Sequence, residues 1–309
     1  MTKKYHSSYA KKRTFKSTLV EKAVKYFFFL NGMISVLFLL LIFLFLFKEA
    51  ISAINNIGIT EFFKNIEWYP TSENSRYSII PLILGTLLTA IPATIISSLL
   101  GITLGIYLSE IASGKTREII KPFIEIFAGL PTVVIGFLML AVGSTYFQEL
   151  FNTGTRLNAL LAAFGLSIIL IPTISSLTED ALRAVPNNLR MASYALGINK
   201  FAMIKNVVIP AAISGVSAGI ILGFGRAIGE TMIVLMVSGN AAELTLNILH
   251  SVRTITATIA GELGEVAIGS PHYYALFFIG TFLLIITFII NLISELIIER
   301  MRKKLNKMN

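Results

Sequence analysis

Six long apolar segments, separated by shorter polar stretches, dominate the pattern of hydrophobic and polar positions along the chain. Each can cross a bilayer, because a spanning helix needs about 20 mostly apolar residues. Helices are expected because backbone groups in lipid must be satisfied within their own segment, and the alternating pattern of barrel strands does not occur. The sequence therefore predicts an all-α integral membrane protein with six transmembrane helices, at about 26–47, 79–108, 123–146, 157–177, 207–237 and 273–298. The two longest segments have room to tilt, or to break at glycine or proline.

Composition supports this assignment. Hydrophobic residues make up 55% of the 309 residues and charged residues 14%, whereas soluble domains carry about 25% charged residues. The net charge of +9 does not indicate nucleic-acid binding, since the basic residues lie at the termini and in short loops. The absence of cysteine excludes disulfides and thiolate chemistry.

The distribution of Lys and Arg predicts the orientation. The first 25 residues hold eight of them and the tail from Arg300 to Lys307 holds five. Together with the loops around 115–121 and 178–206, one side of the membrane carries twenty and the other five. This bias places both termini in the cytoplasm. The expected organisation is a basic cytoplasmic segment 1–25, a first helix with an external loop 26–78, a five-helix core 79–298 and a basic tail 299–309.

The loop between the fourth and fifth segments contains a short helical pattern. Glu179 and Arg183 are spaced for an intrahelical pair, Pro186 suits a helix start, and Gly197 suits a helix end. Four apolar residues share one face at helical spacing: Leu189, Ala192, Ala195 and Leu196. We expect an amphipathic helix at about 186–197 that fits a groove on a partner protein. The alternative is a plain surface connector.

The stretch "GFGRAIGETMIVLM", residues 223–236, places two opposite charges inside an apolar segment. On a continuous helix Arg226 and Glu230 share one face, and Arg226 lies about 24 Å along the axis from Pro210. A charge at that depth costs about 3 kcal/mol and must face the bundle interior or water. A structural ion pair and a functional site both satisfy this demand. The flanking Gly223, Gly225 and Gly229 permit close helix approach or local unwinding.

Two motifs resemble those of a known family. Met191-Ala192-Ser193, three residues, Gly197, nine residues and Val207-Val208-Ile209-Pro210 resemble the EAA motif of permeases in binding-protein-dependent ABC importers. Met191 stands in place of the acidic residue of that motif, and Ser193 in place of an alanine. Further stretches between residues 68 and 291 resemble the C-type permease subunits of Pst phosphate importers, among them "KPFIEIFAGLPTVVIGF" and "GRAIGETMIVLMVSGN".

The resemblance implies an ABC importer permease fold and a pathway for phosphate by alternating access. It assigns Arg226, Glu230 and the three glycines to the translocation path, and we expect Glu230 to neutralise Arg226 until the path opens. It also implies that the cytoplasmic helix couples to the ATPase through Leu189, Met191, Ala192, Ser193, Ala195, Leu196 and Gly197. The implied partners are a second, A-type permease subunit, two ATP-binding subunits and an extracytoplasmic phosphate-binding protein.

No enzymatic role, cofactor or metal site is expected. The chain has no Gly-x-x-x-x-Gly-Lys-Ser/Thr sequence, so ATP hydrolysis is assigned to separate subunits. An intramembrane protease is disfavoured because the segments hold neither His nor Asp. His6, His250 and His272 have no metal-ligand spacing, and His272 and Trp68 are expected at the membrane interface. A permease for sulfate or molybdate, the sister phosphate subunit and a non-transporting scaffold remain as alternatives.

Overall fold

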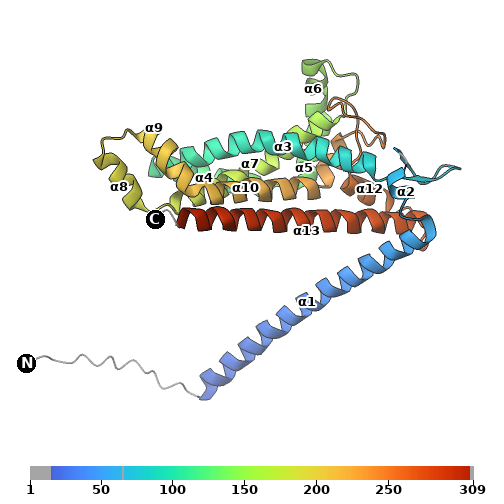
Figure 1. The fold of residues 1–309 in the computed structure, drawn as a ribbon, viewed down its shortest axis with the longest axis horizontal. Helices are drawn as coiled ribbons and strands as arrows, with labels where there is room; N and C mark the ends of the chain where they lie inside the picture. The colour runs from blue at the N-terminus through green and yellow to red at the C-terminus, as the bar shows by residue number, and fades with distance from the viewer. Residues whose placement is uncertain (1–14, 65, 307–309) are drawn as a thin grey trace, which may run out of the picture. The chain divides into compact units, whose positions relative to one another are not determined.

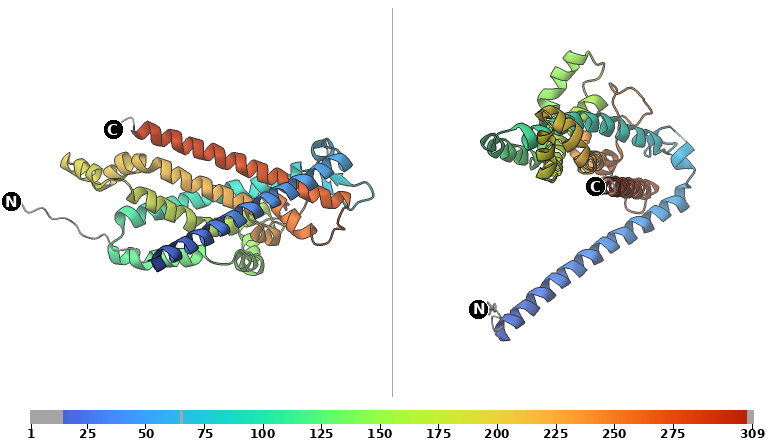
Figure 2. Two further views of the ribbon diagram at one scale, coloured as in Figure 1. Left: turned by 90° about the horizontal axis from the view of Figure 1, so that it is seen from below. Right: turned by 60° about the vertical axis from the view of Figure 1, so that its left-hand side comes forward.

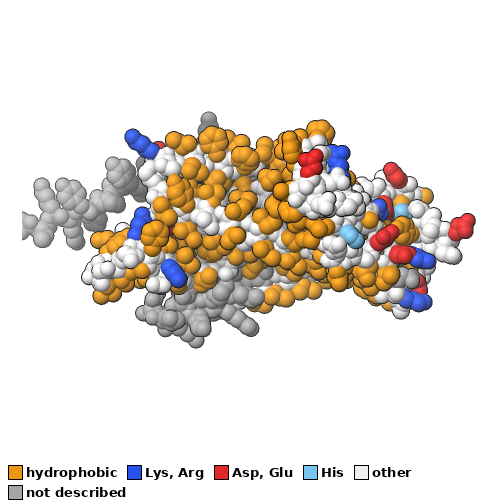
Figure 3. Space-filling view, turned by 90° about the horizontal axis from the view of Figure 1, so that it is seen from above, with side chains coloured by type: hydrophobic (Ala, Val, Ile, Leu, Met, Phe, Trp, Pro, Cys, Tyr) orange, Lys and Arg blue, Asp and Glu red, His pale blue; other side chains and the backbone are white. Residues whose placement is uncertain are grey.

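The computed structural model describes residues 15–64 and 66–306. Within them, six helices are long and apolar enough to cross a membrane: Glu21–Ile57, Ile80–Ile111, Thr132–Phe151, Ala159–Arg183, Lys200–Gly229 and Pro271–Ile293. On the face shown in Figure 3, hydrophobic side chains cover the middle and most charged side chains lie toward the two ends. The predicted six-helix membrane protein is confirmed.

The chain divides into two units, Met1–Lys48 and Glu49–Asn309. The smaller unit contains most of α1 (Phe15–Ile57); residues 1–14 of the predicted basic segment, and 307–309 of the tail, lie outside the described residues. The larger unit begins earlier than the expected core at 79. Residues 49–78 belong to it because Ala53, Phe62 and Trp68 are buried against Leu276 and Ile279.

Four long helices form the larger unit: α3 (Ile80–Ile106), α7 (Ala159–Arg183), α10 (Ile209–Gly229) and α13 (Pro271–Asn306). The views in Figures 1 and 2 show α3, α10 and α13 running side by side. Helix α7 packs against both α3 and α10 and supplies more of the core than any other helix, including Leu161, Leu166, Leu170 and Ile174.

Glycine permits the closest of these contacts. A Cβ on Gly105 of α3 would lie 2.7 Å from the Thr178 Cβ and 2.8 Å from the Ser175 carbonyl oxygen of α7. Both distances are shorter than van der Waals contact, and one of the atoms is backbone that cannot rotate away. The α3–α7 interface therefore depends on this missing side chain, as small-residue contacts do in membranes.

The third apolar segment is interrupted. The predicted single helix 123–146 is wrong in its bounds: α4 (Gly114–Ala128) ends before Pro131, and the spanning part consists of α5 (Thr132–Leu138), the π-helical η2 (Met139–Gly143) and α6 (Ser144–Phe151). Proline disfavours the α conformation in the residue before it, which explains the break inside an apolar run. Glu125 consequently lies on α4, where it is exposed.

One end of the larger unit is built from short elements. These are α2 (Glu61–Lys64), the antiparallel pair β1 (Trp68–Tyr69) and β2 (Arg76–Tyr77), and α12 (Ile255–Glu262). Trp68 is fully buried by the protein itself rather than exposed on the surface of a loop. Its indole donates to Glu262 over 3.0 Å, and Glu262 also pairs with Arg253 at 2.6 Å and His272 at 2.9 Å. This carboxylate ties the hairpin to the segment that precedes α13.

The opposite end carries the helix predicted at 186–197. It forms as α8 (Asn187–Ala195), followed by α9 (Lys200–Met203) and the π-helical η3 (Ile204–Val208), which leads into α10. Figures 1 and 2 show α8 beyond the ends of α7 and α10. The predicted helix is confirmed.

We predict that Gly105→Ala destabilises the protein by about 1–3 kcal/mol, the usual cost of overpacking a close interface. The measurement is the midpoint of thermal unfolding in detergent, followed through the fluorescence of Trp68, the only tryptophan of the chain. Gly114→Ala is the matched control, since a Cβ there would meet nothing within 4 Å, and it is expected to change stability by less than about 0.5 kcal/mol. Equal midpoints for the two variants would contradict the packing argument.

Candidate translocation and coupling sites

The fifth apolar segment breaks beside its charged residues. Helix α10 ends at Gly229, Glu230 is extended with φ −69° and ψ 135°, and α11 (Met232–Val237) then begins. The break leaves backbone groups to be satisfied inside the bundle. The Thr256 hydroxyl of α12 donates to the Glu230 carbonyl over 2.8 Å, and the Glu230 carboxylate accepts from the Met232 N–H over 3.0 Å.

The predicted continuous helix through Glu230 is therefore wrong, and so is the inference that Arg226 and Glu230 share one helical face. Among the described residues, no ion pair joins these two side chains. Arg226, which is partly buried, donates from Nη1 to the Thr173 hydroxyl of α7 over 2.8 Å. The structure thus presents a full positive charge within an apolar span, held by a neutral hydroxyl.

The three glycines beside Arg226 differ in their surroundings. A Cβ on Gly223 would lie 2.9 Å from Ile174 Cδ1, so this position serves close packing against α7. A Cβ on Gly225 would lie 3.5 Å from the Asn291 Oδ1 of α13, whereas one on Gly229 would meet nothing within 4 Å. Thr173 of α7 therefore bonds to Arg226 itself, whereas Asn291 of α13 lies beside the adjacent Gly225. Sequence reasoning missed Thr173 and Asn291, because an isolated Thr or Asn in an apolar segment gives no local signal.

Helix α8 follows Pro186 and is closed by Gly197, which has a φ of +73°. The expected contact residues Leu189, Met191, Ala192, Ala195, Leu196 and Gly197 are all exposed. Ser193 is not: it is 4% exposed, and its hydroxyl donates to the Leu189 carbonyl within α8. Ser193 thus lies on the face of α8 turned toward the protein, and the other six residues form the part of the segment open to a partner. Tyr194 and Phe201 are exposed aromatic residues on the same short segment.

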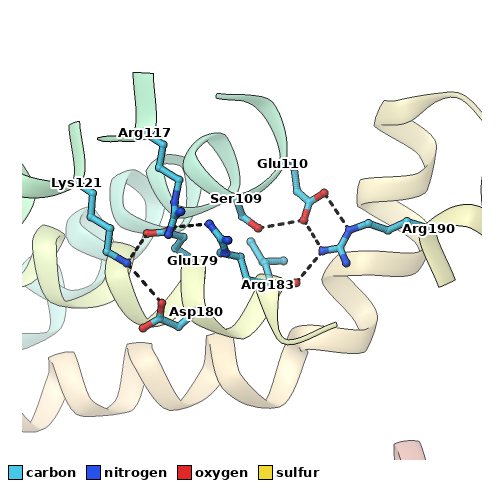
Figure 4. A network of polar contacts seen from close by, with 9 residues as sticks. Ser109, Glu110, Arg117, Lys121, Glu179, Asp180, Arg183 and Arg190 are labelled. Carbon is cyan, nitrogen blue, oxygen red and sulfur yellow. Dashed lines mark hydrogen bonds and ion pairs between the residues drawn. The ribbon is translucent and has the colours of Figure 1, made fainter. Parts of the chain in front are cut away.

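A network of charges lies at the α8 end of the larger unit and joins α4 to α7 (Figure 4). The Glu179 side chain, 1% exposed, pairs with Arg117 Nε at 2.5 Å, Lys121 Nζ at 3.3 Å and Arg183 Nη1 at 3.8 Å. The predicted Glu179–Arg183 pair is confirmed, but α4 supplies the other two cations. A buried carboxylate requires such partners, since removing one side of a buried pair costs about 3–5 kcal/mol.

A second ion pair joins α8 to the end of α3. Arg190 of α8 donates from Nη2 to Glu110 Oε1 over 2.7 Å and from Nε to Glu110 Oε2 over 3.4 Å. Glu110 lies in η1 (Tyr107–Ile111), a π-helical turn that continues α3. No local pattern predicts this pair, because its members are 80 residues apart and belong to different helices.

Comparison with known proteins identifies the family. Residues 101–303 match the family described as binding-protein-dependent transport system inner membrane component. The phosphate transport system permease protein PstC of Xylella fastidiosa is 33% identical over 262 residues, which cover 79% of this chain and 80% of that protein. The probable ABC transporter permease protein YqgH of Bacillus subtilis is 32% identical over 247 residues and 80% of each chain.

Solved structures show the same fold. A chain of a bacterial ABC transporter involved in the import of the acidic polysaccharide alginate has a TM-score of 0.62 at 15% identity, over 91% of this chain and 98% of that chain. A chain of the MetNI methionine ABC transporter has a TM-score of 0.57 at 18% identity, over 72% and 95%. The ABC importer permease fold expected from the sequence is confirmed. The chain belongs to the family of binding-protein-dependent transport system inner membrane components and is a multi-pass permease subunit of an ABC importer, similar to PstC.

Proposed function

We propose that this permease provides the pathway for inorganic phosphate across the cytoplasmic membrane by ATP-driven alternating access. The observation that carries the proposal is the Arg226 guanidinium inside an apolar span, bonded to the neutral Thr173 hydroxyl rather than to a carboxylate. The similarity to PstC proteins, which are named as phosphate transport permeases, agrees with it.

The chemistry of Arg226 suits a passing oxyanion. Phosphate cannot enter hydrocarbon without compensating charge, and the planar guanidinium presents a fork of donors that matches two phosphate oxygens. The Thr173 hydroxyl holds Nη1 in place. Because this hydroxyl is neutral, it does not cancel the positive charge of the guanidinium. The Asn291 amide of α13 lies beside Gly225, the residue that precedes Arg226. These three side chains come from three helices, so a relative movement of the helices changes the site.

The break after Gly229 provides a place for such movement. Glu230 is held by the Met232 N–H and the Thr256 hydroxyl, and we propose that it fixes the geometry of the break. Its carboxylate is thereby held by α11, which reduces its repulsion of an anion at Arg226. Gly223, packed on Ile174, keeps the preceding part of α10 against α7.

The exposed apolar face of α8 is proposed to bind an ATP-binding subunit. Leu196 is 79% exposed and Met191 63% exposed, although both are apolar, and large exposed apolar side chains on a rigid helix mark a binding surface. In this arrangement α8 and both termini lie in the cytoplasm, as the Lys and Arg bias indicates. The complete importer then consists of this chain, an A-type permease subunit, two ATP-binding subunits and an extracytoplasmic phosphate-binding protein.

We predict that Arg226→Gln lowers phosphate uptake at micromolar supply at least about tenfold, equivalent to about 1.4 kcal/mol, because the path loses its positive charge. Arg226→Lys keeps the positive charge but loses the planar fork of donors. Its phosphate uptake is expected to lie between that of the wild type and that of Arg226→Gln. The measurement is uptake of radiolabelled phosphate and, for comparison, sulfate in cells that have no other high-affinity route.

Lys25→Gln serves as the control for loss of one positive charge, and every variant is quantified in the membrane. Wild-type uptake in Arg226→Gln would return the arginine to a structural role. If removal of the chain reduces sulfate uptake but leaves phosphate uptake unchanged, the substrate assignment is wrong.

We predict that Leu196→Asp weakens association with the ATP-binding subunits at least about tenfold, since burial of a leucine contributes about 1.5–3 kcal/mol. The measurement is co-purification of those subunits with the membrane-inserted chain. Leu246→Asp is the matched control, because Leu246 is 80% exposed in the loop that bonds to Leu160 at the start of α7, away from α8. Unchanged co-purification in Leu196→Asp would exclude this face of α8 as the docking surface.

A further inference from the structure

The Glu110–Arg190 pair is the polar link between α8 and the long helices. Two residues of α8 escape exposure, Arg190 and Ser193, and the Ser193 hydroxyl bonds within α8. Among the described residues, Arg190 is the only α8 side chain that hydrogen-bonds to another element. The Glu110 side chain is 6% exposed and that of Arg190 16% exposed, so water screens their attraction much less than at an exposed pair.

Arg190 also binds the end of α7. Its Nη2 donates to the Leu182 carbonyl over 2.8 Å and its Nη1 donates to the Val185 carbonyl over 2.6 Å. The last carbonyls of a helix lack partners within the helix and carry partial negative charge, so an arginine there is doubly favoured. One guanidinium therefore joins three elements: α8, the C-terminal end of α7, and η1 at the end of α3.

The position of Glu110 is itself fixed. The Ser109 hydroxyl donates to Glu110 Oε1 over 3.0 Å, and the neighbouring Leu108 is buried. Both residues lie in η1, a π-helical turn of the kind that is frequent at functional sites. The covalent chain links α8 to α7 through residues 184–186 but does not link it to α3. Glu110 supplies that missing connection.

We propose that Glu110 and Arg190 are positioning residues that make α8, the end of α7 and η1 move as one body, so that displacement of α8 by an ATP-binding subunit reaches α3. This inference rests on the proposed function. It assigns the transmission of movement from α8 to α3 to the contact between Glu110 and Arg190. The exposed apolar face of α8 binds the partner; Arg190, on the opposite side, passes the movement inward. When the contact is lost, the ATP-binding subunits still hydrolyse ATP, but hydrolysis no longer moves α3.

The test uses the complete importer reconstituted in proteoliposomes with its binding protein, and measures phosphate imported per ATP hydrolysed. Allosteric coupling between sites typically amounts to about 5- to 150-fold, so Glu110→Gln and Arg190→Lys are expected to lower this ratio about tenfold while hydrolysis continues. Lys115→Gln is the matched control, because Lys115 is exposed on the adjacent α4, and its ratio is expected to equal that of the wild type. Unchanged ratios in Glu110→Gln and Arg190→Lys would overturn the proposal.

A cross-link between positions 110 and 190 tests whether the contact itself sets the ratio of phosphate imported to ATP hydrolysed. The chain contains no cysteine, so Glu110→Cys with Arg190→Cys creates its only two thiols. The double variant is expected to show the low ratio, and a short bifunctional thiol reagent is expected to restore it by replacing the contact. Single-cysteine variants treated with the reagent control for modification.

The outcomes separate this proposal from the proposed function. If the wild-type complex imports no phosphate, the proposed function fails. If the wild type imports phosphate but the cross-link abolishes uptake, α8 must separate from η1 during the cycle, and the single-body inference is wrong. A bridged double variant that keeps the low ratio would also exclude it.

Discussion

Close packing of α7 between α3 and α10 is the constraint on which both candidate sites depend. Gly105 brings α3 onto Thr178, and Gly223 brings α10 onto Ile174. The same helix supplies Thr173 to Arg226 near its middle and Glu179 to the charge network near its end. Because one rigid element holds the partner of each site, a shift of α7 relative to α3 or α10 alters both. Helix α7 therefore contributes a side chain to each of the two candidate sites.

The two sites satisfy buried charge in opposite ways. Glu179 receives three cations from α4 and α7, which suits a group that must stay fixed in a low-dielectric environment. Arg226 receives one hydroxyl group, which orients the side chain without cancelling its charge. Full compensation would make Arg226 a structural tie, whereas partial compensation leaves an attractive potential for an anion. The structural role of Glu179 and the transport role proposed for Arg226 thus rest on the difference in their partners rather than on depth in the membrane.

The sequence was sufficient where the signal is local. Apolar segments of spanning length located all six helices, Pro186 and Gly197 bracketed α8, and the i, i+4 spacing found the Glu179–Arg183 pair. Contacts between distant residues were beyond it. Glu110 is 80 residues from Arg190 in the sequence, and Trp68 is 194 residues from its partner Glu262. No local pattern predicts either contact.

The helix break was missed for a related reason. The stretch after Gly229 contains no proline and remains apolar, so periodicity alone favours a continuous helix. What stabilises the break is tertiary: the Thr256 hydroxyl from α12 satisfies the Glu230 carbonyl, and the Glu230 side chain caps the first turn of α11. A helix in an apolar environment can end there because partners from elsewhere replace its lost hydrogen bonds. Glu230 is thus explained by the backbone that it supports, and its engagement there agrees with the anion-binding role proposed for Arg226, one turn earlier.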